Sequence, residues 1–261
     1  MPAGARMRTG YGPVAAAARG WARRRRSPRL TILGYHDVLP VPTAPHHIAV
    51  AAFEAQMELL AERAGVSALE DPSGARSPSA AGVAITFDDA RDNFLEFALP
   101  TLERLRLPAT LFAPSRLLGR PGHLRSEELR EVADRGVAVG SHARSHCSLR
   151  DLPAGLLADE IAGSRRELEE LLERPVTTFS YPYGHWDGAA RAEVADAGYR
   201  LAVTTRPGRN TPATDPLLLH RSWPESTMTM AWFEVMVLGG DDLFNHPRLR
   251  ALMRLRNNDE P

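Results

Sequence analysis

The sequence predicts an α/β fold in which roughly seven parallel strands form a distorted (β/α) barrel. From Leu30 onward, short apolar runs alternate with amphipathic stretches, and no internal repeat is present. In addition, each group of chemically active side chains follows directly after a predicted strand. Because parallel strands end at the same edge of a sheet, we expect one site at the carboxyl ends of the strands.

The expected elements follow in order. LTILGY (30–35) is the first strand, and an amphipathic helix with a 3.6-residue period ends near Gly65. The β-branched run VAITF (83–87) predicts a strand buried on both faces, and SEEL (126–129) predicts a capping box at a helix start. The other expected strands are 109–114, 136–141, 176–182, 200–205 and 216–223, and the other expected helices are 92–106, 153–173, 187–198 and 231–240.

Composition limits the classes of function. The chain has 261 residues, 43% of them hydrophobic, and a formal net charge of zero, which argues against nucleic acid as the main partner. No run of 18 apolar residues occurs, so we expect no stable membrane insertion. The single cysteine, Cys147, excludes an internal disulfide.

The termini differ in composition from the middle of the chain. Residues 1–29 are rich in arginine and are interpreted as a basic, disordered tail, with attraction to an anionic surface as the alternative. Residues 30–240 are expected to form the folded domain, and 241–261 a polar tail. No secretory signal is recognised, so the default expectation is a cytoplasmic protein, with extracellular action left open. The sequence does not predict an oligomeric state.

Acidic and imidazole side chains follow two of the predicted strands. Asp88 and Asp89 come after VAITF, and His142 and His146 come after GVAVGS. On a helical turn, the i, i+4 spacing would place both imidazoles on one side, within reach of one metal ion. One carboxylate with two histidines suits a divalent transition metal, and the adjacent carboxylate can act as a base. Each pair alone is also compatible with a solvated turn or a surface coincidence.

A third segment, FSYPYGHWD (179–187), predicts a rigid Pro-Gly loop after a strand. Such a loop can offer a backbone N–H to a developing oxyanion while its aromatic rings contact a sugar. Taken by itself, the segment is better explained as a Pro-Gly turn with core aromatics.

Taken together, TFDDA (86–90), SHARSH (141–146) and SYPYG (180–184) resemble the ordered motifs of polysaccharide deacetylases of the NodB-homology type, carbohydrate esterase family 4. The resemblance extends over roughly residues 30–225. It implies an incomplete (β/α) barrel and a metal-dependent hydrolase that removes N-acetyl groups from an N-acetylhexosamine-containing glycan. The opening stretch, with TILGYH followed by AAFEAQMELLAE, is similar to the circularly permuted branch that includes the poly-N-acetylglucosamine deacetylases.

The resemblance also implies roles for individual residues. Asp88 matches the general base, and the Tyr183 backbone N–H matches the oxyanion donor. His36 matches the permuted general acid and is preferred to His220 and to a packing role. The implied ligands of one divalent ion, Zn²⁺ first with Co, Ni or Fe as alternatives, are Asp89, His142 and His146. The residues expected to contact substrate are Tyr181, Pro182, Trp186 and Arg221.

Three positions depart from the family pattern. Ser180 stands where many members have an arginine that orients the base, Ala143 replaces a hydroxyl residue, and Cys147 replaces a proline. We hypothesise that Arg221 supplies the charge missing at Ser180. The expected partner is a glycan or acetylated sugar, and two alternatives stay open: a deacetylase of a small acetylated sugar metabolite, and an inactive glycan-binding module.

Overall fold

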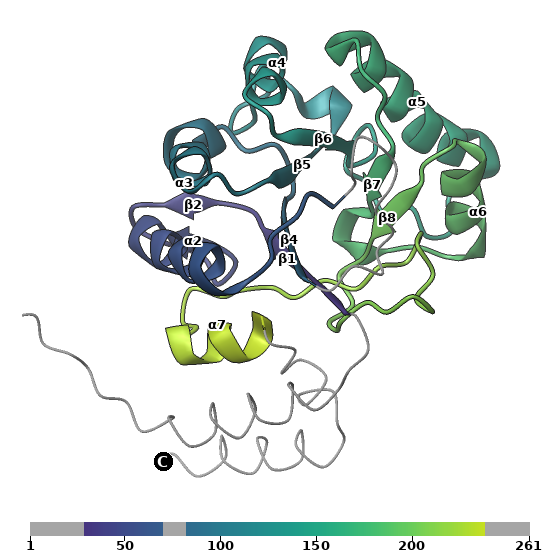
Figure 1. Cartoon of the computed structure of the whole chain (residues 1–261). Helices are drawn as coiled ribbons and strands as arrows, with labels where there is room; N and C mark the ends of the chain where they lie inside the picture. Colours follow the sequence, from purple (N-terminus) through teal and green to yellow (C-terminus); the bar gives the residue numbers. More distant parts are fainter. Residues whose placement is uncertain (1–28, 70–81, 238–261) are drawn as a thin grey trace, which may run out of the picture.

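The computed structural model describes residues 29–69 and 82–237, and within them one curled sheet of six parallel strands forms the centre of the molecule (Figure 1). The strand order is β1-β4-β5-β6-β7-β8, so neighbours in the sheet follow the order of the chain. The strands are β1 (Leu30–Tyr35), β4 (Gly82–Phe87), β5 (Ala109–Ala113), β6 (Ala138–Ser141), β7 (Thr178–Ser180) and β8 (Leu201–Val203).

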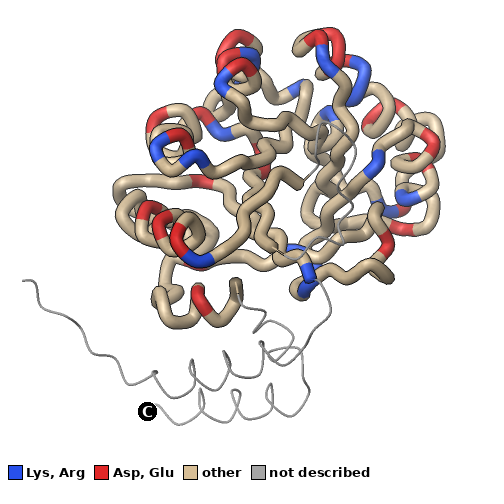
Figure 2. The backbone as a smooth tube through the Cα atoms, in the orientation of Figure 1, with Lys and Arg blue, Asp and Glu red and all other residues tan. Residues whose placement is uncertain are grey.

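Helices connect the parallel strands and lie around the outside of the curled sheet (Figure 1). They are α2 (Val50–Arg63), α3 (Leu99–Leu105), α4 (Ser126–Asp134), α5 (Ala154–Leu172), α6 (Gly188–Asp196) and α7 (Met230–Val237). A short parallel pair, β2 (Val38–Leu39) and β3 (Ile48–Ala49), stands apart from the main sheet. Acidic and basic residues are interspersed on the outer helices (Figure 2).

The helices differ from the prediction at two places, in the N-cap residue of one helix and in the continuity of another. Helix α4 starts at Ser126 as expected, but its N-cap is Arg125, whose backbone N–H donates to Glu128 Oε2 at 2.8 Å. The single helix expected over 92–106 is instead a π-helical turn at Phe94–Ala98 followed by α3, which has Pro100 in its first turn. A proline lacks a backbone N–H and is accommodated where the regular hydrogen-bond pattern starts again.

The segment 217–222 occupies the position of a seventh strand. Leu219 N donates to Ala202 O of β8 at 2.9 Å, and Ser222 N donates to Ile32 O of β1 at 2.8 Å. This segment forms isolated parallel bridges rather than the full strand predicted over 216–223. Its hydrogen bonds nevertheless join the two edges of the curled sheet. The predicted distorted (β/α) barrel is thus confirmed.

Alternate residues of each strand face opposite sides of the sheet. In β1, Leu33 and Tyr35 belong to the large core beneath the helices, whereas Leu30 and Ile32 belong to a smaller cluster that fills the inside of the curled sheet. Strands with both faces buried read as continuous apolar runs, which explains the predicted strand VAITF.

Of the two predicted tails, 1–29 and 241–261, the structure describes only Arg29. Residues 238–240 of the predicted last helix also lie outside the described residues. Among the helices that the structure describes, none has the length and apolar character needed to cross a bilayer.

Candidate active site

The carboxyl ends of four strands bring the predicted site residues together. His36 follows β1, Asp88 and Asp89 follow β4, His142 follows β6, and the loop containing Tyr183 follows β7. Together these side chains border one cavity of about 500 Å³. The cavity is also lined by Gly34, Pro45, His46, Thr205, Trp223, Pro224 and Glu225.

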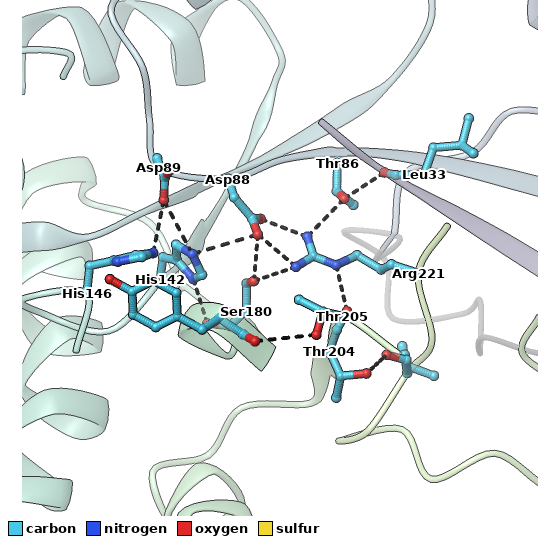
Figure 3. Close-up of polar contacts among 12 residues, drawn as sticks. Leu33, Thr86, Asp88, Asp89, His142, His146, Ser180, Thr204, Thr205 and Arg221 are labelled. Carbon is cyan, nitrogen blue, oxygen red and sulfur yellow. Dashed lines mark hydrogen bonds and ion pairs between the residues drawn. The ribbon is translucent and has the colours of Figure 1, made fainter. Parts of the chain in front are cut away.

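Asp89, His142 and His146 converge on one point of this cavity (Figure 3). Asp89 Oδ1 lies 3.5 Å from His142 Nε2 and 3.2 Å from His146 Nε2. Asp89 Oδ1 is buried and has no hydrogen-bond partner, which is costly unless a cation satisfies it. This donor set consists of one buried carboxylate oxygen and two imidazole nitrogens, and it fits a divalent transition metal.

The environment of His142 prepares its Nε2 atom for ligation. His142 is 1% exposed, and burial holds the pKa of its imidazole below the ordinary value despite the nearby Asp88 and Asp89. Nδ1 lies 2.7 Å from the Ser180 carbonyl oxygen, to which it can only donate. In the neutral ring Nε2 then carries a lone pair, which points toward Asp89.

The two histidines do not lie on a helical turn, and that prediction was wrong. The loop that holds them is irregular because Ala143 and His146 adopt φ values of 60° and 58°. Their rings still meet, with centroids 4.7 Å apart. Asp89 also has a left-handed φ of 71°, a conformation that aspartate tolerates better than most residues, and this turn directs its side chain away from that of Asp88.

Helix α5 holds the histidine loop through one buried carboxylate. Glu160 Oε2 accepts hydrogen bonds from the backbone N–H groups of Arg144 and Ser145, at 3.0 and 2.9 Å. Glu160 Oε1 accepts a hydrogen bond from the Ser145 hydroxyl at 2.7 Å. The sequence analysis did not identify Glu160, because its contact with the loop depends on how α5 packs on the sheet.

Arg221 forms a two-pronged ion pair with Asp88 (Figure 3). Its Nη1 and Nη2 atoms each lie 2.7 Å from a carboxylate oxygen, and its Nε donates to Thr204 O at 2.9 Å. The Ser180 hydroxyl accepts from Nη2 at 3.0 Å and lies 3.2 Å from Asp88 Oδ2. Ser180 therefore contacts the same guanidinium that pairs with Asp88.

The Arg221 pair sets the charge of Asp88. Burial alone would raise the pKa of the Asp88 carboxyl, but the guanidinium and His142 hold it below its ordinary value. Asp88 is only 3% exposed and Arg221 is fully buried, so the attraction between them is poorly screened. The result is a carboxylate that stays ionised at the edge of the cavity.

His36 stacks on Trp223, with ring centroids 5.0 Å apart and an angle of 22° between the planes. This contact requires Gly34, because a Cβ there would lie 2.6 Å from the indole ring. Burial lowers the pKa of the His36 imidazole, although Asp88 and Asp89 act in the opposite direction. His36 Nδ1 is buried and has no hydrogen-bond partner.

The loop after β7 places Tyr183 at the rim of the cavity. Tyr183 has a φ of 58° and is 58% exposed, and its ring lies 4.6 Å from that of His146. The following residue must be glycine, because Gly184 has a φ of 67° and a Cβ would collide with the Thr205 side chain.

The four residues expected to contact substrate are not among those that line this cavity. Arg221 and Tyr181 are fully buried, Pro182 is buried, and Trp186 is half-buried with Arg206 over its ring. Strand β7 ends at Ser180, and the chain then turns at Pro182–Gly184 with a left-handed φ of 58° at Tyr183, so Tyr183 faces outward whereas Tyr181 packs in the core. His220 and Cys147 also lie outside the lining.

The sequence analysis missed other lining residues, namely Trp223, His46 and Glu225. Trp223 had a usable signal, since it is the last residue of the last predicted strand (216–223), and His36 directly follows the first predicted strand. His46 and Glu225 lie on loops whose position depends on long-range packing.

Comparison with known proteins tests the resemblance. The sequence model of the family described as polysaccharide deacetylase matches residues 75–202. A Bacillus subtilis protein whose name assigns it to the polysaccharide deacetylases is 28% identical over 207 residues, which cover 77% of this chain and 73% of that protein. The chain contains a polysaccharide deacetylase domain. The predicted family is confirmed.

Solved structures of other polysaccharide deacetylases share the fold. A Bacillus anthracis structure titled as a polysaccharide deacetylase has a TM-score of 0.73 at 25% identity and covers 81% of this chain and 69% of its own. IcaB from Ammonifex degensii has a TM-score of 0.68 at 25% identity and covers 81% of this chain and 97% of its own. In this polysaccharide deacetylase, His36 precedes and Arg221 follows the residues that match the family model.

Proposed function

We propose that this polysaccharide deacetylase is a metal-dependent hydrolase that removes N-acetyl groups from an N-acetylhexosamine-containing glycan. One observation carries the proposal: a ligand triad, a buried ionised carboxylate and an imidazole border the same cavity. A glycan-binding module without catalysis would not require this combination. The triad is proposed to hold one divalent ion, Zn²⁺ in the first place.

Asp89, His142 and His146 would hold that ion, which when bound supplies polarisation of the acetyl carbonyl and a lower pKa of the attacking water. Asp88 lies 3.7 Å from His142 Nε2 and is proposed to accept the proton of the attacking water. Arg221 keeps the Asp88 carboxylate ionised and fixes its orientation through two hydrogen bonds. The Tyr183 backbone N–H is proposed to donate to the developing oxyanion.

His36 is proposed to protonate the departing sugar nitrogen, because an amine leaves poorly without a proton. Stacking on Trp223 fixes the plane of the imidazole. The exposed Tyr183 ring at the rim provides an apolar surface on which a sugar can pack.

Replacing His36 with alanine is expected to reduce kcat by about 10²- to 10⁴-fold, the usual contribution of a general acid. Metal content is expected to stay at the wild-type level, since His36 is outside the proposed triad. Acetate release and metal analysis on the same preparation test both statements. A His220→Ala variant is the matched control, and the His36 assignment fails if the two variants have equal activity.

Replacing Glu160 with glutamine is expected to weaken metal binding by about 10- to 100-fold, as is usual when the groups that support metal ligands are changed. In the carboxylate, Oε2 accepts from the backbone N–H groups of Arg144 and Ser145, and Oε1 accepts from the Ser145 hydroxyl. The amide has only one oxygen and cannot accept all of these hydrogen bonds. Calorimetric titration of metal-free protein measures the effect. Glu170→Gln, an exposed position on the same helix, is the control. Equal affinities in the two variants would show that Glu160 does not position the ligands.

The substrate is tested by acetate release from N-acetylglucosamine oligomers and from monomeric N-acetylated sugars. We expect oligomers to be hydrolysed with the higher kcat/KM, because Tyr183, Trp223 and Glu225 extend the lining beyond the triad. A preference for the monomers would instead support a small acetylated sugar as substrate. Full metal occupancy without acetate release from either would contradict the proposed activity.

A further inference from the structure

A second group of side chains that could ligate a metal lies beside the cavity, and one of its members, His46, lines it. Asp37, His46 and His47 each present one donor atom, and these atoms all lie within 4.8 Å of one another. None of them belongs to the triad of Asp89, His142 and His146. We propose that Asp37, His46 and His47 form a second divalent cation site, which goes beyond the proposed deacetylation and does not depend on it.

The small β2–β3 pair places Asp37 beside His47. Val38 pairs with Ile48 in parallel register, so the residues just before them, Asp37 and His47, stand opposite each other. The Ile48 N–H donates to the Asp37 carbonyl oxygen at 2.9 Å, which fixes this register. The two donors therefore come from backbone held by hydrogen bonds rather than from free loop ends.

Surrounding groups orient the Asp37 carboxylate. Its Oδ1 atom accepts hydrogen bonds from Asn93 Nδ2 at 2.5 Å and Arg91 Nε at 3.2 Å. The Oδ2 atom lies 3.7 Å from His47 Nε2. Asp37 is 6% exposed, so its remaining oxygen is a well-ordered and poorly hydrated donor. Carboxylates that ligate metals are commonly held by outer hydrogen bonds of this kind.

His47 is oriented from its other ring nitrogen. Nδ1 accepts a hydrogen bond from the Thr43 backbone N–H at 3.3 Å and also lies 3.0 Å from the Thr43 hydroxyl oxygen. In the neutral ring without metal, Nε2 then carries the proton and faces Asp37. A cation on Nε2 requires the other tautomer, in which the Nδ1 proton can be donated to the Thr43 hydroxyl. His46 adds the third donor, and its ring centroid lies 4.5 Å from that of His47. One carboxylate and two imidazoles again match the preference of divalent transition metals.

The charges around the two sites indicate which of them binds a cation more tightly. The Arg91 guanidinium already balances the charge of Asp37, whereas Asp89 has a buried oxygen with no hydrogen-bond partner. Attraction for a cation is consequently weaker at the second site. The competing arrangement is a direct contact between His47 Nε2 and Asp37 Oδ2, with no cation bound.

A cation at this position would lie beside the reaction cavity. His46 lines the cavity, and its ring lies 5.6 Å from that of His36. Three protein ligands leave coordination positions open, and hydroxyl or carboxylate oxygens of a carbohydrate are suitable groups to fill them. The second site would thereby bind substrate oxygens and hold the loop of residues 40–47 against the cavity.

Titration of metal-free protein with Zn²⁺ and with Co²⁺, followed by calorimetry and metal analysis, tests the site. The expected result is two ions per chain, the second bound about tenfold or more weakly. His47→Ala and the exposed His46→Ala are each expected to keep the tighter ion and lose the weaker one. Asp89→Asn is expected to do the reverse, and His185→Ala, outside both clusters, to keep both.

The variants separate this proposal from the proposed deacetylase. One ion per chain in the wild type, or two ions in His46→Ala and His47→Ala, would overturn the second site and leave the first unaffected. A wild-type protein that binds two ions but releases no acetate would contradict the proposed deacetylase activity and leave the second site unaffected. Absence of any bound ion would overturn both. Thermal melting of each variant excludes loss of binding through unfolding.

Discussion

The Asp88→Asn variant is expected to release acetate about 10²- to 10⁴-fold more slowly than the wild type and still to bind one ion at the triad. The amide is nearly the same size as the carboxylate but is a very weak proton acceptor. Asp88 does not belong to the ligand triad, so the ion is expected to remain. Steady-state acetate release and metal analysis on one preparation measure both effects.

The neighbouring aspartate provides the matched control for this experiment. Asp89→Asn removes the other carboxylate at the same strand end, which belongs to the triad. The ion at the triad and the activity are therefore expected to be lost together. Asp88→Asn also leaves Arg221 without its anion, and its stability must therefore be measured in parallel. Near-normal turnover by a folded Asp88→Asn protein would show that another group accepts the proton.

Replacing Arg221 with methionine is expected to lower the free energy of unfolding by about 3–5 kcal/mol, the usual cost of leaving one member of a buried ion pair alone. The Asp88 carboxylate is only 3% exposed. Of its polar contacts described above, those with the Ser180 hydroxyl and His142 would remain in the variant. Without the guanidinium, burial raises the pKa of Asp88, so we also expect a large loss of kcat. Urea unfolding and acetate release measure the two effects.

Two further variants show whether the geometry of Arg221 matters in addition to its charge. Arg221→Lys keeps the positive charge but loses the two-pronged contact, and we expect partial rescue of stability with less rescue of kcat. Arg191→Met breaks a similar pair with Asp215 at the surface, where we expect a cost of about 0–1 kcal/mol. If Arg221→Met costs no more than Arg191→Met, the buried pair does not stabilise the site as described.

The positions of the site residues in the fold could be predicted because they depend on strand ends. His36, Asp88 and His142 each follow an apolar run, and parallel pairing brings such positions to one edge of the sheet. The hypothesis that Arg221 supplies charge near Ser180 rested on the same logic. The structure places its guanidinium against both Asp88 and Ser180.

Local backbone conformation was the main source of error. The spacing of His142 and His146 suggested a helical turn, but Ala143 and His146 adopt left-handed φ values that spacing alone does not reveal. Similarly, aromatic character suggested that Tyr181 contacts substrate, whereas the direction of its side chain places it in the core. Which face a residue presents at a strand end depends on one or two dihedral angles.

Contacts between distant segments formed the second source of error. Glu160 reaches the histidine loop only because α5 packs beside it, and Trp223 reaches His36 only because segment 217–222 hydrogen-bonds to β1. Neither contact has a periodic pattern in the sequence. Such residues were therefore found from the structure alone.

The central claim is that Asp89, His142 and His146 hold an ion on which acetate release depends. The most direct test removes metal with a chelator, restores Zn²⁺ in steps, and follows acetate release from N-acetylglucosamine oligomers against metal content. We expect no turnover in the metal-free protein and a rate that rises in proportion to occupancy of the tighter site. Acetate release by metal-free protein at the wild-type rate would contradict it.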